Sequence, residues 1–216
     1  MTKFFIPLIH LACLATIANA QIEKRSTIIG GQVYYYDSNI DFSTNQKNQK
    51  SRNAIFDISA GKAFTRNDVF GVHLGYSPAS TKNFYDGNEY VNTDVKAYNM
   101  GVFYRHYKSL AKDFYFFIES ELSYLHSKQI NTDTAGANVF TSKQSGAEFV
   151  LTPGISYRIY KKLHLELLIP NIVTLRYNST KETMPTVTLN QKQFVANTSV
   201  NPNSPFYLGV GFHFIF

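Results

Sequence analysis

The C-terminal stretch "SPFYLGVGFHFIF", residues 204–216, is the part of the sequence from which the fold is best inferred. Read in steps of two, one set of its positions is large and apolar: Phe206, Leu208, Val210, Phe212, Phe214 and Phe216. The intervening positions are mostly small or polar: Tyr207, Gly209, Gly211, His213 and Ile215. Successive side chains of a β-strand point to opposite faces, so this pattern predicts a strand with one strongly apolar face.

The composition of the whole chain also favours β structure. The 216 residues suit a single domain, and they include 18 Phe and 15 Tyr but no Trp. Aromatic side chains are enriched in strands, where they pack on a pleated surface. The net charge of +6 is spread without a long basic run, which gives a nucleic-acid partner little support. A mild basic excess is instead compatible with anionic lipid headgroups.

The N-terminus has the features of a cleaved signal peptide. Lys3 supplies a positive charge, residues 4–17 form an apolar core, and Ala18 to Ala20 supply small residues for cleavage. We expect a signal peptide over residues 1–20 and a barrel domain over residues 21–216. A lipidated Cys13 is the alternative, but the residues before it fit a lipidation motif poorly. Cleavage removes the one cysteine of the chain, as suits export to an oxidising compartment.

Eight segments with a period of two follow the signal peptide, and no segment holds a long helical period. Most are close to the 9–11 residues that a tilted strand needs to cross a bilayer. The expected strands run approximately over residues 27–36, 53–64, 69–77, 95–107, 114–127, 146–160, 163–177 and 206–216. Pro153 and Pro170 lie inside two of these segments, where we expect bulges or lost ladder bonds because proline cannot donate a backbone hydrogen bond.

The connections between these segments alternate in length. Long polar connections cover residues 37–52, 78–93, 127–143 and 178–204, whereas short ones cover 65–68, 108–113 and 161–162. In an up-and-down barrel this alternation gathers all long loops at one end and all tight turns at the other. It is the arrangement of outer-membrane barrels, which have extracellular loops and short periplasmic turns.

The two faces of the expected strands differ in chemistry. One face is bulky and apolar, and the other is small, polar and ionisable. In a soluble lipocalin-like barrel the interior would be apolar and the outside polar. Such an interior would not collect ionisable residues of both signs on one parity, because buried charges need partners. We therefore predict lipid outside and an ion-pair network in the lumen, formed by Asp57, Arg105, Glu119, Glu121, Glu148, Arg158, Glu166 and Arg176.

Aromatic residues also fall where two membrane interfaces are expected. One girdle, at the long-loop ends, comprises Tyr35, Tyr76, Tyr98, Tyr124, Tyr177 and Phe206. The other, at the short-turn ends, comprises Phe64, Phe70, Tyr104, Phe114 and Phe216.

The terminal strand resembles that of bacterial outer-membrane proteins, which ends in an aromatic residue, and the chain as a whole is similar to the small OmpA-like and OmpX-like barrels. The resemblance implies an all-β fold: an eight-stranded antiparallel up-and-down transmembrane β-barrel after a cleaved signal peptide. It also implies that Phe212, Phe214 and Phe216 form an assembly signal for the barrel-assembly machinery.

No motif in the sequence points to catalysis, a cofactor or a metal. Some eight-stranded barrels of this kind modify lipid A, which makes the pair His126-Ser127 near the top of a strand a candidate for such chemistry. Adjacent strand residues point to opposite faces, so these two cannot easily share a proton. His73, His164 and His213 share the luminal face, but no short-spaced motif joins them into a metal site.

The sequence thus predicts an integral barrel of the outer membrane of a Gram-negative bacterium, not an enzyme, with a structural or surface-interaction role and a plugged lumen. Its expected partners are outer-membrane lipid, lipopolysaccharide and the assembly machinery. The alternative is an enzyme that modifies lipid A or phospholipid. The long loops are rich in Asn, Thr, Ser, Gln and Lys, and they specify no ligand.

Overall fold

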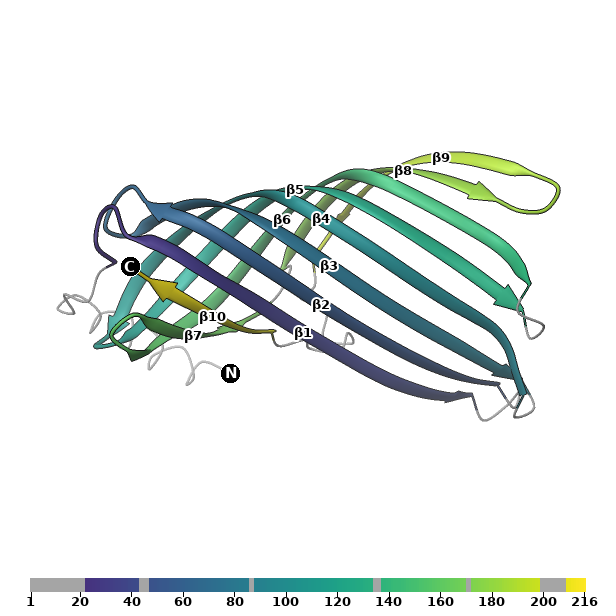
Figure 1. Ribbon diagram of the computed structural model, residues 1–216, viewed down its shortest axis with the longest axis horizontal. Coiled ribbons are helices and arrows are strands. Elements are labelled where there is room, and N and C mark those ends of the chain that lie inside the picture. The colour runs from purple at the N-terminus through teal and green to yellow at the C-terminus, as the bar shows by residue number, and fades with distance from the viewer. Residues whose placement is uncertain (1–21, 43–46, 86–87, 134–136, 170–171, 199–208) are drawn as a thin grey trace, which may run out of the picture.

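The computed structural model describes residues 22–42, 47–85, 88–133, 137–169, 172–198 and 209–216. They form one antiparallel sheet whose strands all share the same tilt across the molecule (Figure 1). The strands are β1 (Thr27–Phe42), β2 (Lys47–Ala63), β3 (Asp68–Tyr85), β4 (Asn88–Ala111), β5 (Phe114–Asp133), β6 (Asn138–Tyr160), β7 (Leu163–Leu168), β8 (Val173–Thr183), β9 (Thr188–Asn197) and β10 (Gly209–Ile215). No helix among the described residues is long and apolar enough to cross a membrane.

Eight of these strands close into a ring. Each of β1 to β5 pairs with the next strand along the chain, β6 pairs with β7, and β7 pairs with β10. The ring closes where β10 pairs with β1, with Phe214 opposite Ile29. This confirms the eight-stranded antiparallel up-and-down barrel. The expected signal peptide and Phe206 lie outside the described residues.

The expected seventh strand is interrupted, which corrects the continuous segment 163–177. Leu168 is opposite Gly154 and Val173 is opposite Leu151, so four positions of the sequence correspond to two in β6, and the amide of Ile169 donates to the carbonyl of Pro153 at 3.0 Å. The insertion is even, so Leu167 in β7 and Leu175 in β8 still face outward. The irregularity expected at Pro153 is therefore present, whereas Pro170 lies outside the described residues.

The connections predicted as long loops are largely strand. β1 and β2 extend into residues 37–52, β3 and β4 into residues 78–93, and β5 and β6 into residues 127–143. The longest connection holds the end of β8 and all of β9, which pair as a hairpin. Backbone hydrogen bonds carry these hairpins beyond the region where side chains alternate between lipid and lumen, so apolar periodicity detects only the inner part of each strand.

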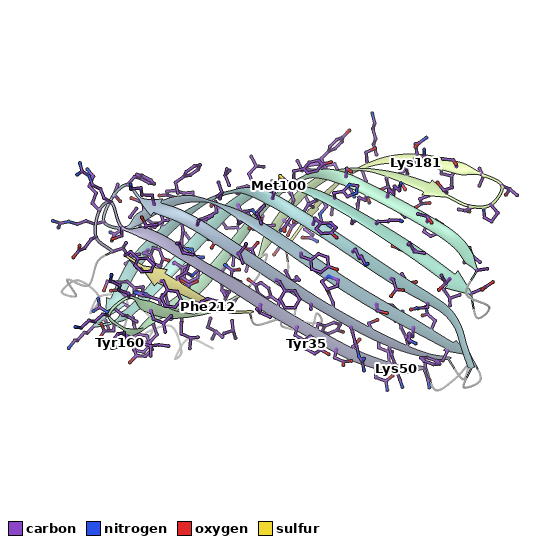
Figure 2. The ribbon with its side chains drawn as sticks, viewed as in Figure 1. Tyr35, Lys50, Met100, Tyr160, Lys181 and Phe212 are labelled. Carbon is purple, nitrogen blue, oxygen red and sulfur yellow. The ribbon has the colours of Figure 1, made fainter. Side chains whose placement is uncertain are left out.

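The outward face carries a belt of exposed apolar side chains. Phe56, Ile58, Val72, Leu74, Leu122, Ile155, Leu167 and Phe212 are each between 45% and 65% exposed. Tyr35, Met100 and Phe212 point away from the barrel (Figure 2). Such a belt is stable against lipid and costly in water, so the arrangement is that of a transmembrane barrel.

The members of both predicted aromatic girdles that the structure describes lie on this outer face. Tyr35, Tyr98, Tyr124 and Tyr177 are more than half exposed at the hairpin end, and the rings of Tyr76 and Tyr98 lie 5.1 Å apart. The second girdle is exposed at the short-turn end and consists of Phe64, Phe70, Tyr104, Phe114 and Phe216.

Candidate functional site

The interior of the barrel holds the ionisable residues that the sequence placed on the luminal face. They come from six strands: Asp57 from β2, Arg105 from β4, Glu119 and Glu121 from β5, Glu148 from β6, Glu166 from β7 and Arg176 from β8. Each occupies the inward position of its strand, because the outward positions on either side carry apolar or exposed side chains. The lumen thus gathers residues separated by more than a hundred positions in the chain.

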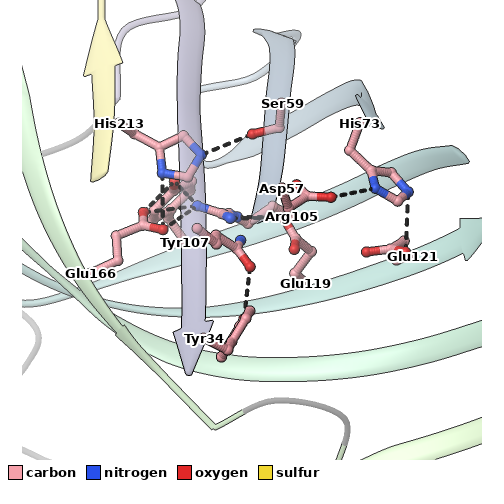
Figure 3. Close-up of polar contacts among 11 residues, drawn as sticks. Tyr34, Asp57, Ser59, His73, Arg105, Tyr107, Glu119, Glu121, Glu166 and His213 are labelled. Carbon is pink, nitrogen blue, oxygen red and sulfur yellow. Dashed lines mark hydrogen bonds and ion pairs between the residues drawn. The ribbon is translucent and has the colours of Figure 1, made fainter. Parts of the chain in front are cut away.

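Arg105 is the centre of the interior network (Figure 3). Its side chain is buried, and its Nε donates to Glu119 at 2.8 Å. Its Nη1 donates to both carboxylate oxygens of Glu166, at 2.8 and 2.9 Å, and to the hydroxyl of Tyr107 at 2.9 Å. Two buried carboxylates therefore share one guanidinium, whose fork geometry suits such contacts.

Two histidines extend this network. His213 Nδ1 lies 2.9 Å from Glu166, and its Nε2 lies 3.2 Å from the hydroxyl of Ser59. His73 lies between two carboxylates, 3.0 Å from Asp57 and 3.1 Å from Glu121. The sequence placed both histidines on the luminal face, but which carboxylates they contact depends on the register between strands.

The remaining predicted members of the network are paired apart from this centre. Arg176 of β8 pairs with Glu148 of β6, its cross-strand partner, closer to the hairpin end of the barrel. Arg158 is not joined to the other predicted residues: it pairs with Asp113 in the turn between β4 and β5. Arg158 is near the barrel rim because it lies two residues from the end of β6. Asp113 was missed because it lies in a turn, where strand parity assigns no face.

An apolar floor, which sequence reasoning missed, closes the interior at the short-turn end. It is a cluster of buried side chains formed by Ile22, Ile28, Ala63, Val69, Phe103, Tyr107, Tyr115, Phe117 and Leu168. Arg105 connects the ion pairs to this floor, because its guanidinium carbon lies 4.3 Å from the ring centre of Phe117. A signal was present in the sequence, since Tyr115 and Phe117 occupy the inward parity of their strand.

Glycine makes room for the floor at one close approach. A Cβ on Gly154 would lie 2.3 Å from the ring of Phe117, far inside van der Waals contact. The bare backbone of β6 at Gly154 therefore lets Phe117, its cross-strand partner on β5, pack directly against it.

A cavity of about 230 Å³ lies on the hairpin side of the network. Its walls include Asp57, Glu119, Glu121, Glu148 and Arg176, together with Gln32 and Tyr34. The hydroxyl of Tyr34 donates to Gln32 at 2.7 Å. The cavity is therefore a cup with four carboxylates in its wall, and the ion pairs and the apolar floor lie beneath it.

The outer face carries a serine–histidine contact, but it does not join the adjacent residues His126 and Ser127. Ser127 faces inward, where it hydrogen-bonds to Gln144, whereas His126 faces outward. His126 Nδ1 lies 2.9 Å from the hydroxyl of Ser145, its cross-strand partner in β6. Among the described residues, no group of three or more His, Cys, Asp or Glu side chains has the arrangement of a metal site.

Comparison with known proteins finds similarity at the level of three-dimensional structure. No protein-family model and no curated protein sequence matches the chain. The outer membrane protein OprG from Pseudomonas aeruginosa is 13% identical, with a TM-score of 0.49, over 90% of this chain and 97% of its own. Neisserial surface protein A is 17% identical, with a TM-score of 0.44, over 88% and 97%. The attachment invasion locus protein Ail of Yersinia pestis is 13% identical, with a TM-score of 0.37, over 89% and 99%.

The strand ring, the apolar outer belt and the charged interior agree with one another. Where β1 pairs with β10, the ring leaves no sheet edge exposed to lipid, and the belt presents apolar groups to lipid while the ion pairs are kept inside. The chain therefore has the fold of the small outer-membrane β-barrels, with buried ion pairs in its lumen.

Proposed function

We propose that this protein is an integral barrel of the outer membrane of a Gram-negative bacterium, exported by the signal peptide of residues 1–20, with a structural or surface-interaction role. The observation that carries the proposal is the filled interior. An eight-stranded ring is wide enough only for side chains, and here the apolar floor and the ion pairs occupy it. The barrel then acts as a stable support that displays four long hairpins.

A closed lumen can be tested by electrical recording. The full mature chain, folded into a planar bilayer, should add no steady ion-sized conductance steps, whereas a porin added to the same bilayer should. Regular steps that scale with the amount of inserted protein would refute the plugged lumen.

Display of the hairpins can be tested on intact cells. An epitope inserted between Pro185 and Thr186, in the turn joining β8 and β9, should bind antibody without permeabilisation. The matched insertion between Lys161 and Lys162, in the turn joining β6 and β7, should bind antibody only after permeabilisation. The reverse result would invert the proposed orientation.

The terminal strand is proposed to serve as the assembly signal, through Phe212, Phe214 and Phe216. All three rings lie on the outer face, and those of Phe214 and Phe216 are stacked with centroids 6.3 Å apart. Phe216→Ala should lower the amount of heat-modifiable barrel in cells while leaving refolding of the purified chain into lipid unchanged. Equal loss in both settings would indicate a purely structural role.

An enzyme acting on lipid is the second candidate, and the contact between His126 and Ser145 is the observation that favours it. In such an enzyme Ser145 would attack a lipid ester carbonyl, while His126 took the hydroxyl proton and returned it to the leaving alcohol. Mass spectrometry of lipid A and phospholipids, with and without the protein, tests this candidate. A changed acyl pattern that Ser145→Ala abolishes would support it, and an unchanged pattern would remove it.

A further inference from the structure

Four lysines lie in register across four neighbouring strands on the outer face, at the hairpin end of the barrel. Lys96 of β4 is opposite Lys128 of β5, Lys128 is opposite Lys143 of β6, and Lys143 is opposite Lys181 of β8. All four side chains are exposed, and they form what we call the lysine row. They are separated by 32, 15 and 38 positions in the chain, so no charge run in the sequence reveals them.

The lysine row has an electrostatic cost unless an anion lies against it. Neighbouring strands are about 5 Å apart, and like charges directly opposite one another destabilise a sheet. Within the described residues none of the four lysines is seen in an ion pair. Asp94, the outward acid nearest along β4, accepts a hydrogen bond from Asn92 instead. The row is therefore a linear array of uncompensated positive charge.

The position of the row identifies the depth at which it meets the membrane. Two residues closer to the membrane centre on the same strands, the outward positions are Tyr98, His126, Ser145 and Ser179, again in register. Two residues further in lie Met100, Tyr124, Ala147 and Tyr177, and the two tyrosines belong to the hairpin-end girdle. The ammonium groups thus lie just beyond the girdle, at headgroup depth, with polar side chains beneath them.

We infer that the lysine row binds the phosphate groups of lipopolysaccharide, which deepens the lipid contact of the proposed function by naming the site and so rests on that function. A row of four cations across about 15 Å matches a headgroup with several anionic groups better than one with a single phosphate. His126, Ser145, Ser179 and Tyr98 supply hydrogen-bonding groups immediately below. The contact between His126 and Ser145 then belongs to this headgroup site.

The short-turn end supplies the matched control. Lys62 and Lys108 are exposed there, opposite the outward rings of Phe70 and Phe116, and the amine of Lys162 lies 5.0 Å from the ring centre of Phe216. Replacing these three lysines by glutamine removes the same charge, at the same outer face, as the variant Lys96→Gln, Lys128→Gln, Lys143→Gln. The three control lysines come from positions that do not pair with one another.

The experiment measures binding of bis-phosphorylated lipid A to the full mature chain folded in detergent micelles, by native mass spectrometry. Each lysine near a lipid surface contributes enough that the lysine-row variant should bind at least about tenfold more weakly. The control variant should bind like the unchanged protein. Equal losses in the two variants, or no loss in either, would overturn the proposal.

Lipids added to the unchanged protein separate the possible ligands without any variant. Lipid A stripped of its phosphates should bind at least about tenfold more weakly than the bis-phosphorylated form. Phosphatidylglycerol that binds as tightly as bis-phosphorylated lipid A would overturn the choice of ligand, as would binding that does not depend on phosphate. Insertion is scored beforehand from the heat-modifiable band, so failure to form a membrane barrel is distinguished from failure of the lysine row.

Discussion

The short-turn half and the hairpin half of the barrel are continuous along the same strands, yet different forces hold them together. In the short-turn half, the ring is closed and its interior is filled by the apolar floor and by ion pairs around the buried Arg105. In the hairpin half, β9 pairs with β8 while nine of its ten residues are exposed. The order of β9 therefore comes from backbone hydrogen bonds to β8 and hardly from side-chain packing. Stability should accordingly reside in the first half and tolerance to change in the second.

The largest effect should follow from breaking the interior network. Arg105→Ala leaves Glu119 and Glu166 buried without their cation, and removing one partner of a buried pair costs about 3–5 kcal/mol. Urea unfolding of the barrel in lipid vesicles measures the loss. Arg158→Ala is the matched control. The ion pair of Arg158 with Asp113 is partly exposed, so its loss should lower the stability by no more than about 1 kcal/mol. Equal losses would mean that the interior pairs do not stabilise the fold.

The apolar floor should be nearly as important. Phe117 is fully buried and contacts both Arg105 and Tyr107, so Phe117→Ala should cost about 3 kcal/mol through lost burial and a cavity. The outward Phe116→Ala, one position away, removes a ring that faces lipid and should cost much less in the same unfolding measurement. A similar cost for both substitutions would show that the floor is not a packed core.

Shortening the hairpin half should have a small effect. Ser179 and Lys192 are cross-strand partners, so residues 180–191 can be replaced by Asn-Gly, which suits a two-residue hairpin turn. The barrel should still form its heat-resistant band, with a loss of no more than about 1 kcal/mol, because locally paired exposed strands carry little of the global stability. Failure of the shortened chain to fold would place stability in the hairpin.

The smallest effect concerns a carboxylate at the start of β3, on the turn side of the girdle. Hydrogen bonds from His106, Thr65 and Tyr104 lower the pKa of Asp68 from 3.8 to about 2. The folded state therefore favours the charged carboxylate, so its contribution is present above about pH 4 and is lost as the pH falls toward 2. Asp68→Asn should cost a few tenths of a kcal/mol at pH 7 and nothing near pH 2. A gap that widens on acidification would contradict this assignment.

Much of the barrel could be predicted from the sequence because a membrane imposes a period of two on every strand. The parity of residues such as Ile58, Leu74, Leu122 and Phe212 identified the lipid face, and the alternate positions placed Glu119 and Glu166 inside. The girdles followed from where tyrosine and phenylalanine end each run. Each of these inferences depends on only one strand at a time.

The tertiary structure alone decided what depends on register between strands. The sequence could not show that Arg105 contacts Glu166, that Arg158 pairs with Asp113, or that Ser145 meets His126, because a shift of two residues preserves every face and changes every partner. The hairpins and β9 also escaped prediction, since exposed polar strands carry no apolar alternation. The sequence therefore determined which way each side chain faces, because that depends on local geometry and solvent, while only the packed ring decided which side chains meet.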